Sequence, residues 1–289
     1  MSSLKPYLQL TRPANLVTAI ADILAGMAIA QFTFSDFSSA LLVLSTLGLY
    51  GGGVVMNDVF DAKLDSVERP ERPIPSGKVP LAQATTMGIS LLLLGIIAAG
   101  AFSLQSGMIA VVVAMLTVLY NRFAKHHVFF GPLVMGMCRG GNLILGMSVL
   151  PESFQQWAFI AVFPIMYIGA ITLISQDEVH GGKKRTLYIA AFLYLAVLAA
   201  QLTIAQGKGN FLFTIPFVLL HAWFIFRPLW NAMQNPIGPL IGKAVKAGVI
   251  SLIVMNASWC AAFGLLPIAI AVLALLPLSM YLAKAFAVT

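Results

Sequence analysis

Four side chains with oxygen acceptors lie close together just after an apolar stretch that ends at Met56. They are Asn57, Asp58, Asp61 and Asp65. In an α-helix, at about 100° per residue, they would share an arc of roughly 100° and extend about 12 Å along the axis. Such oxygens suit Mg²⁺, which completes its shell with water and substrate phosphates. We interpret this face as a Mg²⁺–diphosphate site, in preference to a solvated helix end with acids scattered by chance.

A stiff loop with basic side chains follows this acidic face. Proline and glycine residues between positions 68 and 78 exclude a regular helix there. Arg69, Arg72 and Lys78 could close over a phosphate group, to which arginine can bind in a bidentate manner. The alternative is that they are ordinary positive charges of a cytoplasmic loop. Beside the acidic face, we favour substrate binding.

A second group of candidate ligands lies in a later loop. Asp177, Glu178 and His180 precede the basic run at positions 183–185. A further metal ion on a diphosphate needs a second acidic group, so we predict Asp177 and Glu178 as metal ligands and His180 as a substrate-binding residue. We expect all three to face the first acidic group across the mouth of a cavity. A solvated loop is an equal alternative.

Other polar residues lie near the same predicted surface, at the ends of apolar stretches. Arg12 and Asn15 open the first stretch, whereas Tyr120 and Lys125 close a later one. We predict that they contribute to the same site.

Two ionisable residues fall inside apolar stretches. Arg139 and Asp22 should each be paired or should line a cavity, because an isolated charge in a membrane is costly. We predict substrate binding for Arg139, with a structural Asp22–Arg139 pair as an equal alternative.

Lipid must surround most of this chain. Of its 289 residues, 60% are hydrophobic and only 9% are charged, and the mean hydropathy is +0.92. A soluble domain carries about a quarter charged residues. Apolar stretches near the roughly 20 residues that cross a bilayer recur, without β-barrel alternation. We predict an all-α, polytopic membrane helix bundle with a single domain over residues 1–289. Its nine or ten transmembrane helices are expected at 15–34, 38–56, 81–102, 107–120, 129–150, 156–175, 187–206, 211–226, 244–264 and 266–287.

The basic residues predict the orientation of this bundle. With ten spans, all but two of the 17 Lys and Arg residues fall on one side. Lys208 is alone on the other side, and Arg139 lies within a span. Cytoplasmic loops carry the excess of Lys and Arg, so we place the N-terminus and both acidic loops in the cytoplasm, in an inner or plasma membrane. The net charge of +7 then reflects topology and anionic lipid headgroups, with no nucleic-acid partner.

The acidic motif and the loop after it resemble a known family. Asn-Asp-x-x-Asp-x-x-x-Asp at Asn57–Asp65, followed by Arg-x-x-Arg-Pro-Ile-x-x-Gly, is similar to the first signature of the UbiA superfamily of intramembrane prenyltransferases. The resemblance extends over nearly the whole chain, through Thr11–Asn15 at its entry, Tyr120 to Lys125, and the acidic loop at Asp177. The first motif is highly specific, whereas the others are weak alone.

The resemblance implies nine helices around a central cavity that opens laterally to lipid. It also implies Mg²⁺-dependent transfer of a prenyl chain from prenyl diphosphate to a lipid-phase small-molecule acceptor, commonly an aromatic ring. Carried onto this sequence, it makes Asn57, Asp61 and Asp65 Mg²⁺ ligands supported by Asp58, and makes Arg12, Arg72 and Lys125 diphosphate contacts, with Tyr120 beside the leaving group. The catalytic set would be Asp61, Asp65, Tyr120 and Lys125.

This sequence departs from the family pattern at two places, and two segments resemble a particular branch. The second motif has Gly181 four residues after Asp177, where the pattern has an acid, and Tyr120 and Lys125 are one residue further apart than expected. The segments at 131–140 and 177–182 look like the UbiA-like EboC branch, which is linked to handling or export of secondary-metabolite precursors. The alternative function is therefore a non-catalytic UbiA-like protein that binds or helps export such a precursor, although the intact first motif favours the enzyme.

Overall fold

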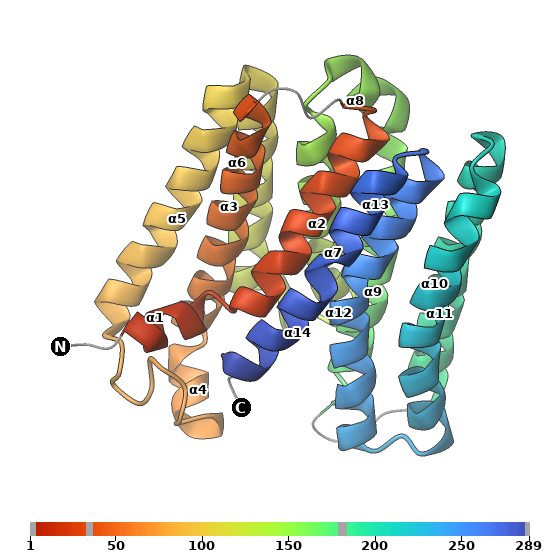
Figure 1. Ribbon diagram of the computed structural model, residues 1–289. Coiled ribbons are helices and arrows are strands. Elements are labelled where there is room, and N and C mark those ends of the chain that lie inside the picture. Colours follow the sequence, from red (N-terminus) through yellow and green to blue (C-terminus); the bar gives the residue numbers. More distant parts are fainter. Residues whose placement is uncertain (1–3, 33–36, 179–183, 287–289) are drawn as a thin grey trace.

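The described part of the chain is almost entirely helical. The structure is a computed structural model that describes residues 4–32, 37–178 and 184–286, and no strand occurs in these ranges. The predicted all-α class is confirmed. The α-helices, labelled where there is room in Figure 1, are α1 (Leu4–Leu10), α2 (Pro13–Ile29), α3 (Ala40–Phe60), α4 (Ala62–Glu68), α5 (Leu81–Phe102), α6 (Leu104–Leu119), α7 (Phe130–Met147), α8 (Pro151–Trp157), α9 (Val162–Ser175), α10 (Lys184–Gly207), α11 (Phe211–Gln234), α12 (Gly238–Ala262), α13 (Leu266–Leu273) and α14 (Leu275–Ala285).

Long apolar helices make this a polytopic membrane bundle. Within the described ranges, eight helical segments are long and apolar enough to cross a membrane, or nine if the bent pair α1–α2 is one span. Their outer faces are apolar: Ile97, Met115, Phe192 and Leu219 are each 64–69% exposed. Side chains of this kind need lipid as their solvent. The predicted number of nine or ten spans stays a prediction.

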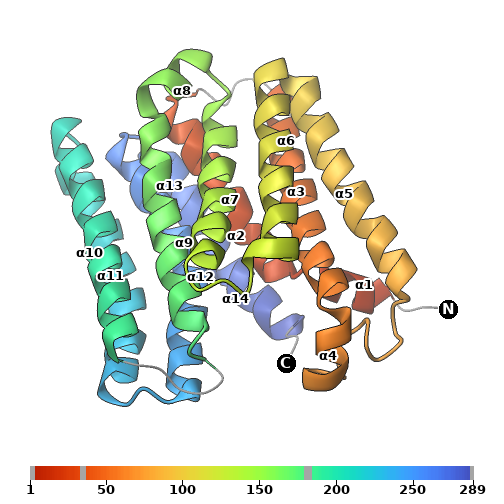
Figure 2. The ribbon, with the colours of Figure 1, turned by 180° about the vertical axis from the view of Figure 1, so that it is seen from behind.

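Close helix contacts hold the bundle together at glycine residues. A Cβ on Gly52 of α3 would lie 2.8 Å from the carbonyl oxygen of Gly88 on α5. One on Gly26 of α2 would lie 2.3 Å from the carbonyl oxygen of Leu143 on α7. Small residues allow such backbone approach between membrane helices, where no hydrophobic force drives association. Viewed from behind, α7 lies between the α3–α5–α6 group and the α9–α12 group (Figure 2).

A buried ion pair joins the middle helices. Arg139 Nη1 on α7 donates to Asp22 Oδ2 on α2 over 2.6 Å, and both residues are at most 5% exposed. Asn256 Nδ2 on α12 donates to the other oxygen of Asp22 over 2.7 Å, and Arg139 Nη2 donates to Thr18 Oγ1 over 2.7 Å. The structural pair that the sequence left as an alternative is therefore present, with its polar atoms partnered.

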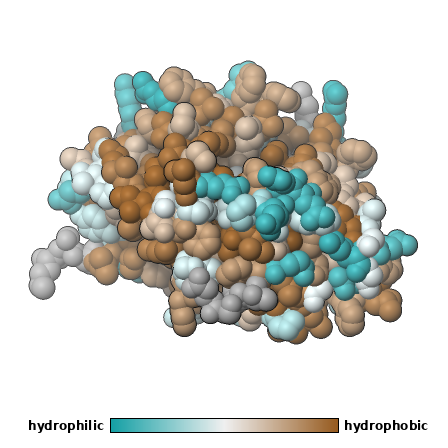
Figure 3. Space-filling model, turned by 90° about the horizontal axis from the view of Figure 1, so that it is seen from above, coloured by the Kyte–Doolittle hydropathy of each residue, from teal (hydrophilic) through white to brown (hydrophobic). Residues whose placement is uncertain are grey.

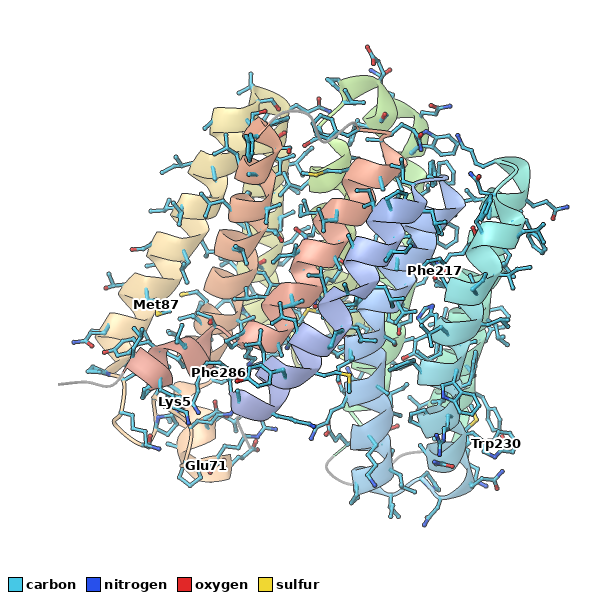
Figure 4. All side chains as sticks on the ribbon, in the orientation of Figure 1. Lys5, Glu71, Met87, Phe217, Trp230 and Phe286 are labelled. Carbon is cyan, nitrogen blue, oxygen red and sulfur yellow. The ribbon has the colours of Figure 1, made fainter. Side chains whose placement is uncertain are left out.

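The two ends of the bundle differ in the residues that they carry. Both ends of the described chain lie at the end that carries α4 (Figure 1), together with the loop that contains Glu71 and the end of α14 at Phe286 (Figure 4). Figure 3 shows the molecule from above, from the end opposite α4. This surface is mostly hydrophobic, with hydrophilic residues gathered over one part. The acidic residues in the last turn of α3 and in α4 lie at the α4 end.

Candidate active site

The acidic face spans the junction between α3 and α4. Asn57 and Asp58 lie in the last turn of α3, Asp61 separates the two helices in a helical conformation, and Asp65 lies in α4. The backbone bonds continue across the break, from Asp61 N to the Asn57 carbonyl (3.0 Å) and from Asp65 N to the Asp61 carbonyl (2.8 Å). Asn57, Asp61 and Asp65, each four residues apart, therefore lie on one face of a nearly continuous helix.

Each carboxylate on this face is buried and has a cationic partner. Arg12 Nη2 lies 2.7 Å from Asp58 Oδ1, and Arg72 Nη1 lies 2.8 Å from Asp65 Oδ2 and 3.4 Å from Asp58 Oδ1. Lys125 Nζ pairs with Asp61 Oδ2. The three aspartates are at most 9% exposed, so their mutual repulsion in a medium of low dielectric would be large without these cations.

Backbone geometry positions Arg12 at the entrance to α2. The α1–α2 pair bends by 47° at this point, and Arg12 has φ 47°, in the left-handed region that a non-glycine residue rarely occupies. Pro13 begins α2, where its missing N–H costs no hydrogen bond. Strained backbone of this kind gathers at functional sites. Here the strained residue is Arg12 itself, whose guanidinium reaches Asp58.

A π-helical turn positions Lys125. Residues Tyr120–Ala124 form this turn after α6, and Lys125 N donates to the Tyr120 carbonyl over 2.9 Å, an i→i+5 bond. Such a turn accommodates one extra residue in a helix and occurs frequently at functional sites. The Tyr120–Lys125 spacing, one longer than the family pattern, is absorbed by this turn, and Lys125 still reaches the acidic face.

Asn121 belongs to the site although the sequence analysis did not single it out. Its Oδ1 accepts from Asn57 Nδ2 over 2.8 Å, and its Nδ2 donates to the Gly53 carbonyl over 3.0 Å. The side-chain oxygen of Asn57, Oδ1, accepts from Lys125 Nζ over 3.3 Å. Asn121 therefore fixes the orientation of the Asn57 amide. The available signal was an asparagine directly after Tyr120, at the end of an apolar stretch.

Of the second acidic segment, the structure describes Asp177 and Glu178. Glu178 lines one pocket together with Arg12, Arg69 and Arg72, and one carboxylate oxygen of Asp177 is buried without a hydrogen-bond partner among the described residues. Asn15 lines the pocket as well. The predicted substrate-binding residue His180 lies outside the described residues.

Two predicted substrate-binding residues are placed apart from the acidic face. Lys78 is exposed in the loop before α5, and it forms no ion pair with another described residue. Arg139 is committed to the ion pair with Asp22 and lies under the Tyr50 ring, with its guanidinium carbon 4.7 Å from the ring centroid. A role in substrate binding stays a prediction for both.

Comparison with known proteins identifies the family of this chain. Residues 19–237 match the UbiA prenyltransferase family. Relatives named digeranylgeranylglyceryl phosphate synthase include one from Thermococcus kodakarensis (29% identical, covering 87% of this chain and 98% of the relative) and one from Methanothermobacter thermautotrophicus (31%, covering 85% and 92%). For the relative from Saccharolobus solfataricus, 30% identical, the match covers 60% of this chain and 61% of that protein.

Solved structures show the same fold. A UbiA homologue from Aeropyrum pernix has a TM-score of 0.70 at 15% identity, covering 84% of this chain and 96% of that one. A homologue from Archaeoglobus fulgidus, bound to GPP and Mg²⁺, has a TM-score of 0.63 at 14% identity, covering 86% and 99%. Nothing in these comparisons singles out the EboC branch, which stays a prediction. The chain belongs to the UbiA prenyltransferase family and is, as such, a membrane-embedded prenyltransferase.

Proposed function

We propose that this protein transfers a prenyl chain from a prenyl diphosphate to an acceptor in the membrane, at the acidic face of α3 and α4. The observation that carries the proposal is the set of three buried aspartates matched by three cations at one end of an apolar bundle. A diphosphate accompanied by metal ions has the same mixture of charges. When it binds, the metal ions can contact the aspartates and the basic side chains can contact the diphosphate. No charge is then left uncompensated.

The reaction breaks the bond between the first prenyl carbon and the diphosphate oxygen, whose electron pair leaves with the diphosphate. An acceptor oxygen bonds to that carbon, and its hydroxyl proton passes to the departing diphosphate. Arg12, Arg72 and Lys125 lie where they can neutralise the departing charge. The surrounding apolar helices exclude water from the allylic cation.

The donor set fits Mg²⁺. No three His, Cys, Asp or Glu side chains of the described residues converge on one metal position, but Mg²⁺ commonly uses only one or two carboxylates and takes the rest from water and phosphates. The ion pairs of Asp61 and Asp65 each use one of two carboxylate oxygens, and the unpartnered Asp177 oxygen offers another ligand. We assign Asn57, Asp61, Asp65 and Asp177 as ligands, with Asp58 and Glu178 in support. Bound Mg²⁺ would supply positive charge to the leaving group.

A glycerophosphate-type lipid is our proposed acceptor. The relatives' name, digeranylgeranylglyceryl phosphate synthase, denotes a prenylated glyceryl phosphate. The aromatic ring expected from the sequence resemblance has no support from these relatives. The non-catalytic carrier is likewise not favoured, because the relatives are named as synthases and the first acidic face is intact.

We place the α4 end of the bundle, with the N-terminus and both acidic loops, in the cytoplasm on the basis of its Lys and Arg excess. In a variant whose native cysteines are replaced by alanine, Ser76→Cys should react with a membrane-impermeant thiol reagent only from the cytoplasmic side. Gln155→Cys, an exposed residue of α8 at the other end, should react only from outside. The reverse pattern would contradict the orientation.

The proposed function is tested by changing one carboxylate. Asp61→Asn keeps the size of the side chain but removes a charge from the acidic face, so Mg²⁺-dependent binding of geranyl diphosphate and prenyl transfer should both fall at least about 100-fold. Glu68→Gln, an exposed change on α4, is the matched control and should retain both. Transfer by the Asp61→Asn protein at the wild-type rate would refute the assignment.

A further inference from the structure

A pocket of about 570 Å³ opens at the α4 end, beside the acidic face. Its polar side chains come from segments far apart in the sequence and include Arg12, Arg69, Arg72, Lys246 and Glu178. Four cations and one carboxylate therefore share one pocket. The volume lies within the range of pockets that hold small-molecule ligands.

These four cations fall into two pairs. Arg12 and Arg72 are bound to Asp58 and Asp65 of the acidic face. Arg69 and Lys246, by contrast, form no ion pair with any carboxylate in the described ranges. Two positive charges in the pocket are therefore available to an anionic ligand.

The single carboxylate of the pocket lining is held at one side. A Cβ placed on Gly242 of α12 would lie 2.6 Å from Glu178 Oε1, so the carboxylate packs directly on the start of that helix. Lys246 lies one turn further along the same helix. Glu178 packs against Gly242 and forms no ion pair with Lys246 in the described ranges.

The rest of the pocket lining is largely apolar. Val249 and Ile250 of α12 contribute to it together with Leu282 of α14 and Phe286 just beyond that helix. Phe286 marks the end of α14 in Figure 4, at the same end of the bundle as Glu71. A ligand that fills this pocket must therefore combine an anionic head with a hydrocarbon chain.

We infer that Arg69 and Lys246 bind the phosphate of the acceptor lipid and so determine acceptor specificity, with its hydrocarbon chain against α12 and α14. This inference rests on the proposed function and assigns separate cations to its two substrates. Arg12 and Arg72, at the border, serve the diphosphate at the acidic face. With its phosphate on Arg69 and Lys246, the acceptor shares the pocket with these two arginines, and its hydroxyl comes near the prenyl donor.

The test measures binding without turnover. Protein in phosphatidylcholine nanodiscs, which carry no net headgroup charge, is titrated with a long-chain monoalkyl glycerol phosphate and with the matching monoalkyl glycerol. The wild type should bind the phosphate at least about tenfold more tightly, a modest value for two charge-assisted contacts. The double variant Arg69→Gln/Lys246→Gln should lose this preference and keep its affinity for the alcohol.

Matched measurements separate this inference from the proposed function. Lys243→Gln changes an exposed lysine on the same helix outside the pocket lining and should retain the preference. Affinity for geranyl diphosphate with Mg²⁺ should stay within about twofold in both variants, since the acidic face is intact.

Three results would overturn the inference: a wild type without the preference, a double variant that keeps it, or a parallel loss of geranyl diphosphate affinity. The last would assign these cations to the donor. A wild type that shows the predicted preference but transfers no prenyl chain would refute the proposed function and leave the phosphate subsite standing.

Discussion

The π-helical turn before Lys125 can be tested by changing the number of its residues. Five residues of α-helix turn by about 500°, so Lys125 would point about 140° away from Tyr120. Four residues turn by about 400°, which is only about 40° from the starting direction. Deleting Phe123, which is 72% exposed in the π-turn, should therefore allow a plain α-helix that still directs the lysine at Asp61.

Inserting an alanine after Phe123 is the opposite perturbation. It gives a spacing of six, which turns an α-helix by about 600° and leaves the lysine about 120° from the starting direction, so the insertion should misdirect the lysine. We expect the deletion to keep kcat/KM for prenyl transfer within about tenfold of wild type. The insertion should lose about 100-fold or more, as Lys125→Met does, because a contact to the leaving group is lost.

The assay is transfer from geranyl diphosphate by protein that elutes as a single species and retains its helical circular dichroism. The reasoning would be refuted by a folded deletion variant as inactive as Lys125→Met. An insertion variant as active as wild type would refute it equally, because the lysine's direction would then not matter.

Two further predictions concern stability and are measured by unfolding in detergent. Asp22→Asn and Arg139→Met should each destabilise the protein by about 3–5 kcal/mol because each leaves a buried charge unpaired, and the double variant should recover most of the loss; single costs below about 1 kcal/mol would contradict this. Gly26→Ala places a methyl group 2.3 Å from the Leu143 carbonyl oxygen and should cost about 1–3 kcal/mol. Gly100→Ala, with open space around the new methyl group, should be neutral or stabilising, and equal effects at the two glycines would exclude the packing argument.

Local spacing made the acidic face predictable. Asn57, Asp61 and Asp65 recur every four residues, so a helical backbone places them together whatever surrounds them. The predicted span at 81–102 coincides with α5 for the same reason, since apolar length alone defines it. The predicted spans at 211–226 and 244–264 are shorter than α11 and α12, because those helices continue beyond their apolar portions.

Long-range partners were less predictable. The sequence suggested that Arg12, Arg72 and Lys125 lie near the acidic face, but which carboxylate each one contacts depends on how α2, α3 and α6 pack. Lys246 lies far along the chain from the first motif and reaches the same pocket only through the position of α12. Such contacts depend on the angles and distances at which the helices pack, which the spacing of the charged residues along the chain does not define.

The buried Asp22–Arg139 pair has a consequence for biogenesis. Asp22 lies in α2, which leaves the ribosome well before its partners: the ionic partner is 117 residues later and the amide partner Asn256 is 234 residues later. A lone aspartate at the centre of a helix costs about 2.5–3.5 kcal/mol during insertion by the translocon. Until α7 has been synthesised, α2 is therefore a poorly stabilised membrane segment. Its final placement waits for the later helix, so insertion of this protein is coupled to the order in which its helices meet.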